Sequence, residues 1–282
     1  MTSLVSRAWR SPTFMIGAML TLVLCLAALL SLFWSPYPFA EIDIPAKLQP
    51  PSAAHWLGTD SLGRDIASQL LVGSQNSIVV GLVAVGIGLA IGVALGCVAA
   101  ASQAQGRGWL EEVIMRASDF AFAFPALLSA IMLTAIYGPG LLMSIVAIGI
   151  FNIPVFARIT RGSALAVWAR DFITAARAAG KGPLAITLDH VLPNIASPLI
   201  VQATISFATA ILAEAALSYL GLGTQPPQPS WGRMLNEAQT MMFQAPMLAV
   251  YPGVAIMLSV LGLNLIGDGL RDVLDPRLAR RR

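Results

Sequence analysis

The polar segment Arg170–Pro183 interrupts a very apolar chain, and its polar residues recur at helical spacing. An i, i+4, i+7, i+11 pattern predicts one polar stripe along a helix. The stripe consists of Arg170, Thr174, Arg177 and Lys181. The opposite side of the helix carries Phe172, Ile173, Ala176 and Ala179. Cations on such a stripe can pair with acidic groups of another protein, so the predicted chemistry is binding. A solvated amphipathic loop without a partner is the alternative.

Three further residues predict how this segment folds. Gly180 lies where a helix C-cap is expected, and Pro183 fits the first position of a second short helix. Pro193 is then expected to break that second helix before the next apolar run. The segment therefore predicts a helix-turn-helix that projects from a membrane protein.

The sequence lacks common catalytic signatures. The pair Gly180-Lys181 does not belong to a P-loop. Ala175 stands where the first glycine of a P-loop is needed, and Gly182 stands where Ser or Thr is needed. No His-Glu-x-x-His zinc motif and no Gly-x-Ser-x-Gly elbow occur. His55 could join Asp60 and Asp65 at a metal, but no second histidine is near, which favours an ordered loop. We expect a non-catalytic chain that binds neither cofactor nor metal.

Composition defines the broad class. Hydrophobic residues make up 57% of the 282 residues, charged residues make up 11%, and the mean hydropathy is +0.76. Soluble domains carry about 25% charged residues, so this chain is predicted to be an all-α integral membrane protein. The net charge of +3 does not indicate nucleic acid, because the basic residues are explained by membrane topology. Cys25 and Cys97 fall in separate apolar runs and are expected to be packing residues.

Six apolar runs are long enough to cross a bilayer. They cover residues 14–34, 77–101, 113–137, 141–159, 195–220 and 247–266. The first run is longer than the core of a signal peptide, and no clear cleavage site follows, so we expect a retained span. Residues 1–75 are predicted to hold this span and an extracytoplasmic loop, and residues 76–282 a five-helix core with a polar loop at about 161–194.

Two of these runs carry packing signals. Gly88, Gly92 and Gly96 repeat every four residues in the second run, which favours close contact with another helix. Pro125 predicts a kink in the third run. Arg116 and Asp119 lie near the first end of the third run, where they can reach the interface or each other.

Glu214 is the clear ionisable residue deep inside a predicted span, and such residues are candidates for function. A proton relay would need a partner, and the sequence shows no paired acid or base near it. We therefore favour hydrogen-bonded packing over a transport-path role for Glu214. An ion-coupled secondary transporter, an intramembrane enzyme and a structural subunit remain alternatives, but none of them needs a projecting helix-turn-helix.

The basic residues are distributed unequally between the two sides of the predicted topology. Fourteen fall on the side of the termini and of residues 161–194, against three on the other side. The fourteen are Arg7, Arg10, Arg107, Arg116, Arg158, Arg161, Arg170, Arg177, Lys181, Arg271, Arg277, Arg280, Arg281 and Arg282; the three are Lys47, Arg64 and Arg233. Because cytoplasmic loops are rich in Lys and Arg, both termini are predicted to be cytoplasmic.

Four motifs resemble the permease subunits of binding-protein-dependent ABC importers, and the resemblance covers almost the whole chain. The helix-turn-helix resembles their EAA loop: Thr174-Ala175-Ala176, Gly180 and Leu192-Pro193 match it in spacing, with Thr174 in place of Glu and His190 in place of a hydrophobe. Residues 58–65, Gly-Thr-Asp-Ser-Leu-Gly-Arg-Asp, are similar to a signature of dipeptide, oligopeptide and nickel permeases of the C-subunit type. Residues 220–232 and 264–276 resemble two later signatures of that family.

The resemblance implies a bacterial inner-membrane subunit that forms half of a translocation path. It implies import of short peptides (dipeptide, oligopeptide or glutathione-like), with nickel or another small solute as the alternative. The implied partners are a second homologous permease, one or two cytoplasmic ATPases that bind ATP and Mg, and an extracytoplasmic solute-binding protein. The implied ATPase-coupling residues are Arg170, Thr174, Ala175, Ala176, Arg177, Gly180, Lys181, Leu192 and Pro193.

Overall fold

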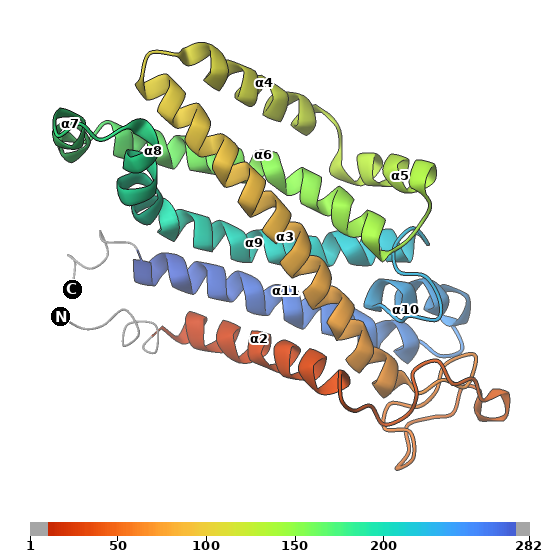
Figure 1. The fold of residues 1–282 in the computed structure, drawn as a ribbon. Coiled ribbons are helices and arrows are strands. Elements are labelled where there is room, and N and C mark those ends of the chain that lie inside the picture. Colours follow the sequence, from red (N-terminus) through yellow and green to blue (C-terminus); the bar gives the residue numbers. More distant parts are fainter. Residues whose placement is uncertain (1–10, 275–282) are drawn as a thin grey trace.

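The computed structural model describes residues 11–274, and long helices dominate this part of the chain (Figure 1). The helices are α2 (Pro12–Ser31), η1 (Ile44–Ala46), α3 (Ile66–Ala104), α4 (Gly108–Ala123), α5 (Ala126–Tyr137), α6 (Leu141–Trp168), α7 (Asp171–Ala178), α8 (Pro183–Ile186), η2 (Thr187–Val191), α9 (Leu192–Tyr219), α10 (Trp231–Ala238), η3 (Gln239–Met241) and α11 (Met247–Leu274). Residues 1–10 and 275–282, which include six of the fourteen basic residues counted above, lie outside the described residues.

The predicted all-α membrane fold is confirmed. Five helical segments are long and apolar enough to span a membrane, and the bent pair α4–α5 makes a sixth. The two halves of that pair meet at 83°, so the kink predicted at Pro125 is a full break in the helix. Proline causes it by removing a backbone donor and clashing with the preceding turn.

Several helices extend beyond the predicted spans. α3 begins at Ile66 rather than near residue 77, because the Asp65 side chain caps it by accepting from the Ser68 backbone N–H at 2.8 Å. α6 continues to Trp168 and α11 to Leu274. Hydropathy marks only the part of a helix that lies in lipid, so it missed these polar extensions.

The predicted break at Pro193 is wrong, because the chain is helical without interruption from Pro183 to Tyr219. The π-helical segment η2 lies directly before this proline, and the Leu192 N–H donates to the Thr187 carbonyl five residues back. The wider π turn accommodates a residue that has no N–H of its own. Pro193 therefore lies in the first turn of α9, where proline is tolerated.

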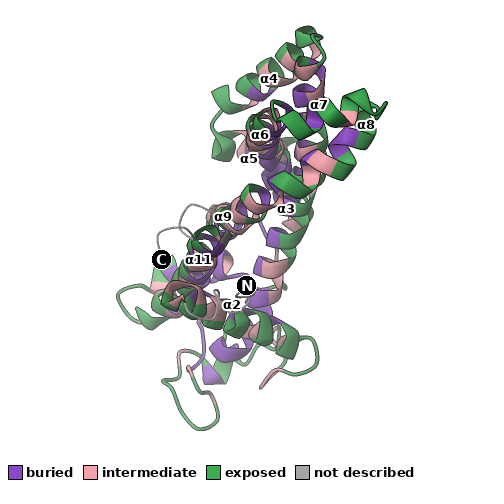
Figure 2. Cartoon of the chain, turned by 90° about the vertical axis from the view of Figure 1, so that its left-hand side faces the viewer, coloured by how far each residue is buried: buried purple, intermediate pink, exposed green. Residues whose placement is uncertain are grey.

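α2, α6, α9 and α11 lie roughly along one direction, and the tilted α3 crosses them (Figure 1). α3 packs on α6 and α9, whereas α2 packs on α11, which in turn packs on α9. One buried core joins α3, α6, α9 and the α7–α8 region, and a second joins α2, α9, α10 and α11. Exposed residues cover much of the outside of α2, α4 and α5 (Figure 2). We refer below to the α7 end and the α10 end of this bundle.

The glycines of α3 do face another helix, as the small-residue spacing predicts. A Cβ added at Gly88 would lie 2.3 Å from the Asn152 Cβ, and one at Gly92 would lie 2.5 Å from the Ile153 carbonyl oxygen. A Cβ at Gly96 would meet the Ala157 carbonyl oxygen at 2.5 Å. Since two of these three contacts are with backbone atoms of α6, side-chain rotation cannot relieve them.

We expect Gly92→Leu to destabilise the protein by about 1–3 kcal/mol, the usual cost of overpacking a close contact. Gly86→Leu on the same helix is the matched control, because no atom lies within 4 Å of a Cβ added there. Thermal unfolding of both variants in detergent measures the difference. Equal unfolding midpoints would contradict the close contact between α3 and α6.

Candidate functional site

The predicted helix-turn-helix is present, and it projects beyond α6 and α9 at the α7 end of the bundle (Figure 1). Gly180 has φ +81°, the left-handed conformation predicted for the turn, and Pro183 begins α8. Ile173 is fully buried, and Ala176 packs against the core shared by α3, α6 and α9. The unit is thus fixed to the membrane helices by its own apolar side.

The predicted cationic stripe is only partly formed. α7 ends at Ala178, so Lys181 lies in the turn rather than on the helix, where its Nζ contacts the Asp189 carboxylate at 2.8 Å. The Arg177 guanidinium lies over the Trp168 ring, 5.1 Å from its centroid, and donates to the Ala104 carbonyl. These two cations therefore interact first with their own chain.

The outer surface of the unit is largely apolar or small. Phe172, Leu184 and Leu188 are exposed large apolar residues, and Ala175 is exposed as well. Among the other predicted coupling residues, Arg170, Thr174 and Pro193 are exposed and Leu192 is half-buried. Exposed apolar side chains that gather on a polar loop favour contact with another protein.

The sequence hypothesis of a metal around His55 is not supported by the geometry. His55 Nδ1 contacts the Asp65 carboxylate at 3.0 Å, whereas Asp60 pairs with Arg64 at 2.6 Å and accepts from Gln69 at 2.8 Å. Within residues 11–274, no group of three His, Cys, Asp or Glu side chains is placed to hold a metal ion. The loop at the α10 end is instead held by hydrogen bonds and ion pairs.

Arg64 links this loop to α10 by reaching Glu237 at 2.5 Å as well as Asp60. Burial opposes its charge, but the two carboxylates outweigh burial and raise the pKa of Arg64 above its ordinary value. Arg233 contacts the same Glu237 carboxylate at 2.9 Å. Four charges therefore join the segment before α3 to the short helix before α11.

Glu214 is fully buried near the α10 end of α9 and hydrogen-bonds within its own chain. Its Oε1 accepts from the Ser218 hydroxyl at 2.6 Å and from the Thr224 hydroxyl at 3.3 Å. The Ser218 oxygen also accepts from the Thr224 backbone N–H at 3.0 Å. This arrangement ties α9 to the loop after it, and the packing role that the sequence favours for Glu214 stays a prediction.

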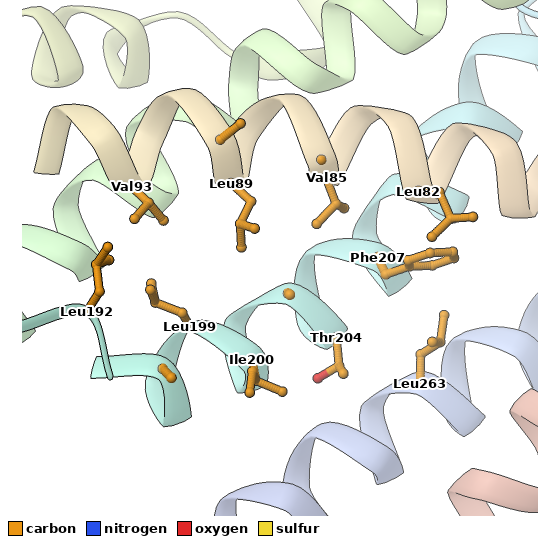
Figure 3. A pocket seen from close by; sticks show the side chains of 14 residues that line it. Leu82, Val85, Leu89, Val93, Leu192, Leu199, Ile200, Thr204, Phe207 and Leu263 are labelled. Atoms are coloured by element: carbon orange, nitrogen blue, oxygen red, sulfur yellow. The ribbon is translucent and has the colours of Figure 1, made fainter. Parts of the chain in front are cut away.

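A groove of about 710 Å³ lies between α3 and α9 (Figure 3). Leu89 and Val85 face Leu199 and Phe207 across it, and Leu263 of α11 borders one end. Thr204 supplies the one polar side chain among its lining residues. Because a charged group would lose its hydration there without gaining partners, the groove does not suit a charged substrate.

From sequence, Arg116 and Asp119 could reach the interface or each other, and the structure pairs each of them with a different residue. Arg116 contacts Glu112 on its own helix at 2.8 Å, and Asp119 pairs with Arg158 of α6. Both pairs are exposed. Residues 39 positions apart cannot be paired from sequence alone, so the Asp119–Arg158 contact was missed.

The bundle of apolar helices with a projecting helix-turn-helix has the arrangement that the sequence resemblance to permease subunits predicts. The binding-protein-dependent transport system inner membrane component family matches residues 92–280, and the chain belongs to this family of ABC importer permeases. The glutathione transport system permease protein GsiD of Escherichia coli O157:H7 is 45% identical over 265 residues, which are 94% of this chain and 86% of the relative. GsiD of Pectobacterium atrosepticum is 45% identical over 251 residues, 87% of this chain and 82% of its own.

A solved structure has a similar fold. It is the MetNI methionine ABC transporter in inward-facing conformations, with a TM-score of 0.61 and 20% sequence identity. The match covers 73% of this chain and 97% of the chain in that structure. At this identity the likeness concerns the fold alone.

Proposed function

We propose that this permease serves import of short peptides, with glutathione-like peptides as the first candidates. The observation that carries the proposal is the 45% identity to glutathione transport permeases along 94% of the chain. A second permease is proposed to complete the path, with the exposed sides of α4 and α5 facing it across the path. An extracytoplasmic solute-binding protein delivers the peptide in this proposal.

The α7 end is proposed to face the cytoplasm. The start of α2 and the end of α11 lie at this end together with α7 and α8 (Figure 1). Described basic residues concentrate there too, among them Arg107, Arg161, Arg170 and Arg177, whereas Lys47, Arg64 and Arg233 belong to segments of the other end. The positive-inside rule supports this orientation.

The α7–α8 unit is proposed to dock on a cytoplasmic ATPase, which binds ATP and Mg and supplies the energy. Its inner side is fixed by Ile173 and Ala176, so a push on the outer side would be passed to α6 and α9. Exposed ion pairs contribute only about 0–1 kcal/mol each, and Arg177 and Lys181 already have partners in their own chain. Shape around Phe172, Ala175 and Leu184 is therefore proposed to dominate the contact.

Reconstituted with its second permease, ATPases and binding protein, the chain is expected to take up labelled glutathione and dipeptides in an ATP-dependent manner. Uptake into proteoliposomes is the measurement, and omission of the binding protein is the control. If nickel is taken up and no peptide is, the peptide proposal is wrong while the importer architecture stands.

We expect Gly180→Val to reduce transport about tenfold or more and to loosen the ATPase. The β-branched side chain opposes the left-handed turn by about 1–2 kcal/mol, although there is space around its Cβ. Gly182→Val is the matched control: it lies in the same turn, has equal space, and its φ of −72° suits valine. Co-purification of the ATPase and transport are measured together. Equal behaviour of the two variants would show that the turn geometry does not matter for coupling.

A further inference from the structure

The ion pair between Asp119 of α4 and Arg158 of α6 lies where the uncharged part of α6 ends. The first part of α6, residues 141–157, carries no charged residue. This part spans about 25 Å, against a hydrocarbon thickness of about 30 Å, so Arg158 lies at the inner border of the membrane core. α6 continues for about 15 Å beyond it to Trp168.

Both charged side chains are open to the surroundings on this chain. The Arg158 side chain is 52% exposed and the Asp119 side chain 65% exposed. An ion pair directed at acyl chains would lose hydration that it keeps beside water, and charges in spans usually face a water-filled cavity or the interior of a bundle. The exposure therefore points to an aqueous surface.

The backbone beside the pair gives an independent indication. α4 ends at Ala123 and α5 begins at Ala126, and the 83° bend between them leaves irregular backbone a few residues from Asp119. Phe124 and Leu127 are exposed, so this chain does not cover the break. Irregular backbone at membrane depth is tolerated only where protein buries it or where it lines water, and broken helices often form transport sites.

Exposed aromatic side chains lie on the same helix as Asp119, and one of them contacts Arg158. The Arg158 guanidinium lies over the Phe122 ring, 4.7 Å from its centroid. Phe120 and Phe124 contact each other edge to face with centroids 5.2 Å apart, and all three rings are exposed. The pair thus combines one cation and one anion with an apolar border, in contrast to the uniformly apolar groove between α3 and α9.

We propose that Asp119 and Arg158 form a charged constriction in the wall of the translocation path and contact the charged groups of the passing substrate. A short peptide carries an ammonium group and a carboxylate, which match Asp119 and Arg158 respectively. The guanidinium can bind a carboxylate through two parallel hydrogen bonds. In the empty path the two side chains neutralise each other, so the constriction attracts no free ions. The assignment to peptide charges depends on the proposed function; the assignment to the path does not.

Cysteine labelling in the assembled transporter tests the location. Replacing Cys25 and Cys97 removes both native thiols, and Asp119→Cys then introduces one thiol at the pair. Membrane-impermeant charged thiosulfonates are expected to modify it, whereas Met19→Cys on the exposed side of α2 reacts only with a lipid-soluble maleimide. Phe122→Cys takes the place of Asp119→Cys if the latter does not assemble.

Electrostatics and transport provide the second readout. Adding Arg158→Gln to Asp119→Cys is expected to lower the ratio of anionic to cationic reagent rates about tenfold. Asp119→Asn and Arg158→Gln, each alone, should reduce peptide uptake at least about tenfold, while the exposed pair Glu112–Arg116 on the same helix is the control, with Arg116→Gln transporting normally.

Two labelling results would overturn the proposal. Modification by the lipid-soluble reagent alone would place the pair against acyl chains, and no modification by either reagent would place it under a partner subunit. Labelling needs no substrate, so it decides the location even if the wild-type transporter fails to take up peptides. In that case the proposed substrate is wrong, and the labelling result alone decides whether the pair lies in the translocation path.

Discussion

The contact between α3 and α6 is the interaction on which the rest of this structure depends. Gly88, Gly92 and Gly96 bring α3 close to α6, because each leaves no side chain of α3 between the two helices. In lipid, where burying apolar area gains little, such close van der Waals packing is the main source of helix association. α9 then packs against both helices and completes the core.

This contact fixes the position of everything that α6 carries. One continuous helix runs from the α10 end past Arg158 to Trp168, and α7 and α8 follow directly. We therefore expect movement of the α7–α8 unit to move Arg158 as well, and to move α9 because α8 and η2 continue into it. At the other end, Arg64 and Glu214 tie the loops to α10 and α9, which gives the bundle one end held by buried polar contacts and one end open to a partner.

Local features were predictable from sequence because single residues determine them. Gly180 specifies a left-handed turn, Pro183 a helix start, and the glycines of α3 a close helix contact. Features that depend on tertiary context were not. Pro193 lies in a continuous helix because the π turn η2 directly precedes it. Lys181 pairs with Asp189, and Arg177 stacks on Trp168. The Asp119–Arg158 pair joins two helices whose relative rotation no periodicity in one sequence reveals.

We propose that the α7–α8 unit is the mechanical link between this chain and an ATPase. Cross-linking tests it most directly: Ala175→Cys, in a chain without Cys25 and Cys97, is treated with a short thiol-to-amine reagent in the active transporter. We expect a cross-link to the ATPase whose yield changes with bound nucleotide, and none from Ser52→Cys at the α10 end. An active transporter that gives no cross-link from Ala175→Cys in any nucleotide state would contradict it.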